Sequence, residues 1–126
     1  MAQINCFEDL SIWKDSRCLV GEIYSIFSSI NDFCFRDQIQ RATVSIMNNI
    51  AEGLERGSDL DFCRFLYIAK SSCGEVRSML YLALDLHYLD EEKKLNLQND
   101  CKKISSSIQN LISYLKQNTK TPKVKN

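Results

Sequence analysis

Proline and glycine are scarce in this chain of 126 residues, and that scarcity limits the folds open to it more than any other feature. The single proline is Pro122, and only four glycines occur. Strands joined by tight turns depend on these residues, whereas the interiors of long helices exclude them. We therefore expect an all-α protein. The length indicates one domain, because a chain of this size encloses one hydrophobic core.

Apolar residues recur at helical spacing in four segments, which predicts an antiparallel up-down four-helix bundle. The expected helices span residues 8–29, the segment after Asn31 as far as Gly57, residues 59–88 and residues 91–117. The bundle domain would then cover residues 1–117, and residues 118–126 would form a mobile, basic tail.

Local signals predict where the helices begin and end. Glu8 and Asp9 would complement the positive end of the first helix dipole, and Asn31 would cap the second helix. Gly57 suits the left-handed residue that ends a helix, and Ser58 with its capping box would start the next helix almost at once. The second and third helices should therefore form a hairpin.

The third helix carries two apolar stripes. One is the core stripe from Phe62 to Ala83, and the other contains Ile68, Ser72, Met79, Leu82 and Leu86. A helix that is apolar on two sides needs cover on both, either from its own bundle or from another subunit.

A row of polar residues borders the apolar face of the second helix and interrupts a simple amphipathic pattern. In a hairpin, Arg41 would lie level with Glu75, Ser45 with Lys70 or Ser71, and Glu52 with Arg64. We interpret the row as a hydrogen-bonded network between two helices that fixes their register. The alternatives are a solvated face with weak surface pairs and, less consistent with the residue types, a catalytic site. The expected network comprises Gln38, Arg41, Ser45, Asn49, Glu52, Arg56, Arg64, Ser72 and Glu75.

Cysteine and histidine usage argues against metal chemistry. The six cysteines form no CxxC pair, and His87 is the only histidine, so we expect free thiols and no catalytic residue, metal or cofactor. The N-terminal sequence is acidic where a signal peptide would be basic and apolar, and no run of about 18 apolar residues occurs. We expect a soluble, cytoplasmic protein without a membrane partner.

Basic and acidic residues balance at 16 each but are unevenly distributed. Residues 116–126 contain four lysines and no acid, which leaves a net charge of −4 on the rest of the chain. Such a tail is a candidate for contacts with nucleic acid, although short lysine tails also serve only solubility. The candidate contacts are Lys116, Lys120, Lys123 and Lys125.

The segment from Gln38 to Val76, QIQRATVSIMNNIAEGLERGSDLDFCRFLYIAKSSCGEV, resembles the signature of the bacterial four helix bundle proteins, also called 23S rRNA intervening-sequence proteins. Phe7, Leu10 and Trp13 resemble the opening of that family. Three positions depart from its pattern: Ser28 replaces a proline, Asp61 a glutamate and Ser71 a glycine. The matching positions are Gln38, Arg41, Ala42, Ser45, Ile46, Asn49, Ile50, Ala51, Glu52, Gly53, Arg56, Ser58, Phe62, Arg64, Phe65, Leu66, Ile68, Ala69, Ser72 and Glu75.

The resemblance implies an antiparallel four-helix bundle that assembles into a ring-shaped homopentamer. It also implies a relation in architecture to the accessory protein of diversity-generating retroelements, which binds nucleic acid and a reverse transcriptase. Two functions follow as hypotheses: a non-catalytic scaffold that associates with RNA or other nucleic acid, and a module that docks a partner protein without touching nucleic acid. Added salt separates them, because phosphate binding weakens steeply with salt. Four tyrosines are candidates for base stacking, although their helical spacing favours packing: Tyr24, Tyr67, Tyr81 and Tyr88.

Overall fold

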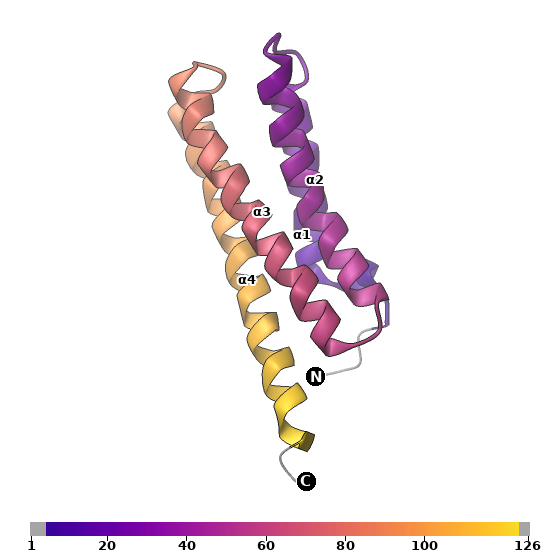
Figure 1. Ribbon diagram of the computed structural model, residues 1–126. Helices are drawn as coiled ribbons and strands as arrows, with labels where there is room; N and C mark the ends of the chain where they lie inside the picture. Colours follow the sequence, from indigo (N-terminus) through magenta and orange to yellow (C-terminus); the bar gives the residue numbers. More distant parts are fainter. Residues whose placement is uncertain (1–4, 124–126) are drawn as a thin grey trace.

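Four long helices form the molecule (Figure 1). The computed structural model describes the backbone of residues 5–123 and the side chains of residues 5–118. Consecutive helices run in opposite directions, α1 lies behind α2 in Figure 1, and α4 runs beside α3, as predicted for an antiparallel bundle. The elements are the short 3-10 helix η1 (Phe7–Asp9), α1 (Ser11–Phe27), α2 (Phe33–Glu55), α3 (Asp59–Asp85) and α4 (Glu91–Lys123).

Each helix turns one apolar stripe to a common core. Phe27, Ile23, Ile46, Leu80 and Ile108 are among the side chains buried completely. Burial of a side chain of this size stabilises the fold by about 1.5–3 kcal/mol before the cost of ordering the chain. The packing is uneven: α2 and α3, and α3 and α4, share long interfaces, whereas α1 packs mainly on α2 and touches α4 less. The weakest seam of the bundle therefore lies between α1 and α4.

The turn between α2 and α3 follows the sequence prediction. Gly57 has a φ of 89°, and the Ser58 Oγ accepts a hydrogen bond from the Asp61 N–H at 3.1 Å. The left-handed glycine ends α2, and the serine starts α3 directly afterwards. This hairpin holds the two helices that carry the polar row side by side.

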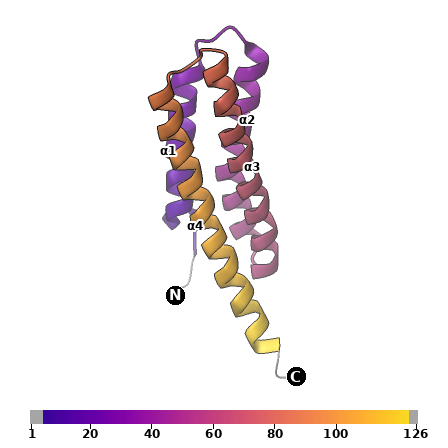
Figure 2. The same cartoon turned by 90° about the vertical axis from the view of Figure 1, so that its left-hand side faces the viewer.

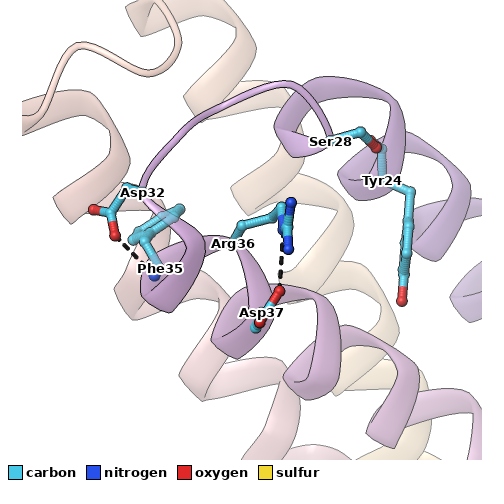
Figure 3. Close-up of polar contacts among 6 residues, drawn as sticks. All are labelled: Tyr24, Ser28, Asp32, Phe35, Arg36 and Asp37. Carbon is cyan, nitrogen blue, oxygen red and sulfur yellow. Dashed lines mark hydrogen bonds and ion pairs between the residues drawn. The ribbon is translucent and has the colours of Figure 1, made fainter.

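Two predicted helix starts are wrong. Glu8 and Asp9 belong to η1, because the Leu10 N–H bonds to the Phe7 carbonyl at 2.9 Å and Leu10 is extended, so that α1 begins at Ser11. The cap of α2 is Asp32 and not Asn31: the Asp32 carboxylate accepts the Phe35 N–H at 3.1 Å (Figure 3).

Short local contacts finish the corner between α1 and α2 (Figure 3). Ser28, one of the three departures from the resembled pattern, donates its hydroxyl to the Tyr24 carbonyl at the end of α1. Arg36 pairs with Asp37 at 3.0 Å in the first turns of α2. The serine thus closes the last turn of α1 with a hydrogen bond, a role that a proline side chain has no donor to perform.

The third and fourth helices also end at residues other than those predicted. His87 has a φ of 64°, and the Tyr88 N–H bonds to the Ala83 carbonyl at 2.8 Å, which ends α3 before residue 88. The carboxylate of Asp90 accepts the Lys93 N–H at 2.8 Å at the start of α4. The helix α4 continues to Lys123, past the expected end at residue 117, and projects beyond the other helices (Figure 2). The predicted mobility of the tail concerns residues that lie partly outside those described.

At Gly53, α2 and α3 approach each other closely. A Cβ built at this position would lie 2.7 Å from the Phe65 Cβ and 3.0 Å from the Phe62 Cδ1. The absence of a side chain therefore lets the two helices pack closely just above their turn. Among the described residues, no helix is long and apolar enough to cross a membrane.

Candidate functional site

The polar row runs along the outer edge of the interface between α2 and α3. Its centre is a small hydrogen-bonded cluster: the Ser45 and Ser72 hydroxyls are 2.9 Å apart, and the Asn49 Nδ2 donates to the Ser45 carbonyl at 2.8 Å and to the Ser45 Oγ at 2.9 Å. Ser72 is buried, and its partners are half-buried. Ser45 thus pairs with Ser72 and not with Lys70 or Ser71, because the hairpin register differs slightly from the one expected.

The charged residues of the row do not pair across the two helices as predicted. Glu52 pairs with Arg56 of the same helix at 3.4 Å, and Arg64 pairs with Asp61 of its own helix at 3.4 Å. These neighbours on one helix are within easier reach than the facing helix. The expected pair of Glu52 with Arg64 is therefore replaced by two local pairs.

Arg41 and Glu75 are exposed and, within the side chains that the structure describes, form no ion pair with each other. Gln38 is exposed as well. The row therefore has a hydrogen-bonded centre and solvated charged ends. Its outer residues fit the alternative interpretation, a solvated face with weak surface pairs. Exposed pairs of this kind contribute little to the stability of a single chain.

Apolar side chains lie beside these charges on α3. Ile68 is 48% exposed, Leu82 46% and Leu86 42%, whereas Met79 of the same stripe is buried. The bundle itself thus covers only part of the second stripe of α3. We call the resulting surface the α2–α3 face; it consists of Gln38, Arg41, Ser45, Asn49, Glu52, Arg56, Arg64, Ile68, Ser72, Glu75, Leu82 and Leu86.

The opposite edge of α3 contacts α4 through polar groups that the sequence patterns did not identify. Lys70 Nζ donates to the Gln109 Oε1 at 2.7 Å, and the Gln98 Nε2 donates to the Arg77 carbonyl at 3.1 Å. These residues are far apart in the sequence, and no local pattern predicts their contact. They meet only because of the register in which α4 packs on α3. Polar side chains therefore help to fix that register.

The candidate tail and tyrosine residues fall into different environments. Lys116 lies on α4, where its Nζ donates to the Tyr67 hydroxyl at 2.7 Å. Tyr24, Tyr67 and Tyr81 are exposed, so their helical spacing does not bury them, whereas Tyr88 packs against the Phe35 ring at a centroid distance of 5.2 Å. The side chains of the other tail lysines lie outside those described: Lys120, Lys123 and Lys125.

The thiols divide into buried and accessible groups. Burial raises the pKa of Cys73 and of Cys101 to about 12, so both remain protonated at neutral pH. Cys63 is also buried, whereas Cys18 and Cys34 are exposed. In the part of the chain that the structure describes, no three cysteine, histidine or acidic side chains are placed to hold a metal ion.

A shallow groove of about 440 Å³ follows the weak seam between α1 and α4. Glu22 and Asp100 face each other across it, and Lys93 lies on the same wall. Partial burial, followed by the negative charge of Asp100, raises the pKa of Glu22. Two carboxylates at one seam repel each other when both are ionised, so the groove weakens the contact between these helices at neutral pH.

The model of the 23S rRNA-intervening sequence protein family matches residues 8–110. The chain belongs to this family. A solved structure described as a protein with unknown function from the S23 ribosomal protein family of Bacteroides thetaiotaomicron is similar, with a TM-score of 0.75 and 25% sequence identity over 80% of this chain and 97% of that chain. No curated protein matches the chain.

The matched region places the α2–α3 face inside the family domain. Residues 8–110 contain every residue of that face, whereas Lys116 and the lysines after it lie beyond the match. The resemblance noted from the Gln38 to Val76 segment is thus confirmed as family membership, and the four-helix bundle is confirmed as the fold.

Proposed function

We propose that this chain is a non-catalytic scaffold whose copies assemble into a ring, a homopentamer by the family resemblance, and that the assembly associates with nucleic acid. The observation that carries the proposal is the α2–α3 face. Ile68, Leu82 and Leu86 are exposed there beside the charges of Arg41 and Glu75. An apolar stripe flanked by opposite charges is suited to a second protein surface.

A second copy is the partner that this surface favours. In a ring, each copy uses two different surfaces, and the α2–α3 face serves as one of them. Arg41 and Glu75 are then available to pair with charges of a neighbouring copy, and the apolar stripe of α3 is covered. The name of the family refers to an intervening sequence of 23S rRNA, which supports nucleic acid as the second partner.

The titratable groups support a non-catalytic role. The pKa of about 12 keeps the buried thiols of Cys73 and Cys101 from acting as nucleophiles at neutral pH. The one histidine, His87, is exposed in the turn between α3 and α4, where it serves the end of a helix. These groups therefore favour a function that the surfaces of the protein carry out.

Sedimentation velocity tests the assembly. We expect the wild-type chain to sediment as a multiple of 14.5 kDa, and Ile68→Glu or Leu82→Glu to reduce it to smaller species, because each places a charge at an apolar contact. Leu95→Glu is the matched control, since Leu95 is similarly exposed, at 49%, but lies on α4. A wild-type chain that sediments as a single copy, or a control that dissociates equally, would remove the α2–α3 face from the proposal.

Nucleic-acid association is tested on the same chain by fluorescence anisotropy with a labelled ribosomal-RNA hairpin. We expect binding that weakens steeply between low and moderate salt. A protein that assembles but binds no nucleic acid at low salt would instead act as a docking module for a partner protein.

A further inference from the structure

Two exposed tyrosines on α3 are each accompanied by a lysine from α4. The Lys116 Nζ lies 5.1 Å from the centroid of the Tyr67 ring and donates to its hydroxyl, and the Lys94 Nζ lies 4.7 Å from the centroid of the Tyr81 ring. Tyr67 and Tyr81 remain 41% and 58% exposed, respectively. Both pairs lie on the edge of α3 that faces α4, opposite to the α2–α3 face.

Basic side chains continue along the same edge between the two tyrosines. Lys70 is held by Gln109, and Arg77 lies where Gln98 crosses from α4. Lys102 is exposed and follows Gln98 by one helical turn, which places it in the same row. We call this surface the α3–α4 seam; it consists of Tyr67, Lys70, Arg77, Tyr81, Lys94, Gln98, Lys102, Gln109 and Lys116.

The charge of the seam is locally unbalanced, although the whole chain is neutral. Residues 101–126 contain six lysines and no acidic residue. On α3, Glu75 is the only acidic residue between Asp61 and Asp85, and it belongs to the α2–α3 face. Acidic residues lie at both ends of the seam: Glu91 pairs with Lys94 at 3.3 Å, Asp85 follows Tyr81 by one helical turn, and Asp59 lies, like Lys116, close to Cys63. The central part of the seam therefore presents positive charge without a neutralising carboxylate.

We propose that the α3–α4 seam binds a single strand of nucleic acid. Lys70, Arg77, Lys102 and Lys116 contact the phosphates, and the rings of Tyr67 and Tyr81 support unpaired bases. This inference rests on the proposed association with nucleic acid and names the surface and the form of the ligand. The rings lie about 21 Å apart along the helix, so several nucleotides fit between them.

The tyrosines favour a single strand over a duplex. Stacking on an aromatic ring needs a base whose face is free, and bases inside a duplex have both faces covered. Because each ring lies against an ammonium group, a base on the ring brings its own phosphate within reach of a lysine. A duplex would use the charges but not the rings.

The test is fluorescence anisotropy on the full chain with a labelled RNA strand of about 12 nucleotides, within the site sizes of known single-strand binders. The seam variant combines Lys102→Gln and Lys116→Gln, and the control variant combines Lys14→Gln and Lys93→Gln, which removes the same charge from exposed positions elsewhere. We expect the seam variant alone to bind about tenfold or more weakly at low salt. The slope of log K against log salt should fall by about 0.7 for each phosphate that the variant no longer neutralises.

Two further variants separate the seam from its alternatives. Tyr81→Leu keeps an apolar side chain and should weaken the strand by about fivefold or more while leaving a duplex of the same length unaffected. A tail variant with Lys120, Lys123 and Lys125 changed to glutamine should keep most of the binding. Circular dichroism confirms that each variant is folded.

The measured affinities test three claims separately: the location of the site, the preference for a single strand, and the association with nucleic acid. The proposed seam would be wrong if the seam variant bound RNA as tightly as the wild type, or if the control variant lost as much affinity. It would also be wrong if binding depended on the tail lysines alone. Tighter binding of the duplex, with no effect of Tyr81→Leu, would overturn the single strand. If the wild type binds neither RNA at low salt, the proposed association with nucleic acid fails, and the seam fails with it.

Discussion

His87 holds a left-handed backbone conformation that glycine adopts more easily than any other residue. Its φ of 64° lies at the end of α3, where Gly57 plays the corresponding part for α2 with a φ of 89°. We predict that His87→Gly raises the free energy of unfolding by about 1 kcal/mol, because it relieves the Cβ of an unfavourable contact with the backbone. Urea denaturation measures the change.

Gly57→Ala is the matched comparison for that variant. It introduces the same strain at the other turn and should lower the free energy of unfolding by about 1 kcal/mol. If both changes have the same sign, the backbone conformation of these residues is not what limits stability there.

Gly53 tests how closely α2 and α3 approach. Gly53→Ala should destabilise the bundle by about 1–3 kcal/mol, because the new methyl group meets Phe65 and Phe62 at distances that require a shift. Gly21→Ala is the control: its Cβ meets nothing within 4 Å, and alanine should stabilise α1 by up to about 1 kcal/mol. Thermal melts of both variants measure the difference, and a Gly53→Ala protein as stable as Gly21→Ala would contradict the close approach.

The loop between α1 and α2 and the loop between α3 and α4 lie at the same end of the bundle, and a side-chain hydrogen bond joins them. The Tyr88 hydroxyl donates to the Asp32 Oδ2 at 2.7 Å, and this bond, followed by the Phe35 N–H, lowers the pKa of Asp32 below its ordinary value of 3.8. A carboxylate whose pKa is lower in the folded state than in the unfolded state stabilises the fold at pH values above its unfolded-state pKa. This stabilisation is lost as the pH falls through its folded-state pKa. The bond therefore stabilises the fold at neutral pH and not in strong acid.

We predict that Tyr88→Phe lowers the melting temperature near pH 6 and that the difference from wild type shrinks as pH falls below 3.8. The substitution keeps the ring on Phe35 and removes only the hydroxyl donor. Tyr24→Phe serves as the control because Tyr24 is exposed. A difference that does not change with pH would contradict the role of Asp32.

The seam between α1 and α4 should respond to pH in the opposite direction. Because the pKa of Glu22 is raised above 4.5, ionisation of Glu22 beside Asp100 disfavours the folded state as pH rises above that value. We predict that Glu22→Gln stabilises the protein at neutral pH and that the gain disappears below about pH 4.5. Urea midpoints at the two pH values measure this, with Glu55→Gln, at an exposed position away from the groove, as the control.

The sequence predicted the number, order and direction of the helices, because their apolar periodicity and the Gly57 and Ser58 turn are local signals. It predicted Asn31 as the cap of α2, whereas Asp32 caps that helix, because both adjacent residues have suitable side chains. It also placed Ser45 level with Lys70 or Ser71, whereas Ser45 bonds to Ser72, and it placed Arg41 level with Glu75, although these two side chains form no ion pair among the described residues. Such contacts change when one helix shifts by a single residue relative to its neighbour, and apolar periodicity alone does not determine that register.

For the whole molecule, the two edges of α3 have different chemistry. The α2–α3 face combines exposed Ile68 and Leu82 with charges of both signs, whereas the α3–α4 seam has tyrosines and basic residues. From the sequence, only the tail stood out as basic, because residue order alone does not place Lys70 and Arg77 of α3 beside the lysines of α4. In the proposed assembly, with copies contacting each other on one edge and phosphates bound on the other, several copies of a weak site would act together.

Native mass spectrometry of the full chain, mixed with the labelled single strand, tests this division of α3 most directly. We expect particles whose protein mass is a multiple of 14.5 kDa, five copies by the family resemblance, with RNA bound to the assembly. Particles that contain one 14.5 kDa chain at every protein concentration, with no RNA attached, would contradict it.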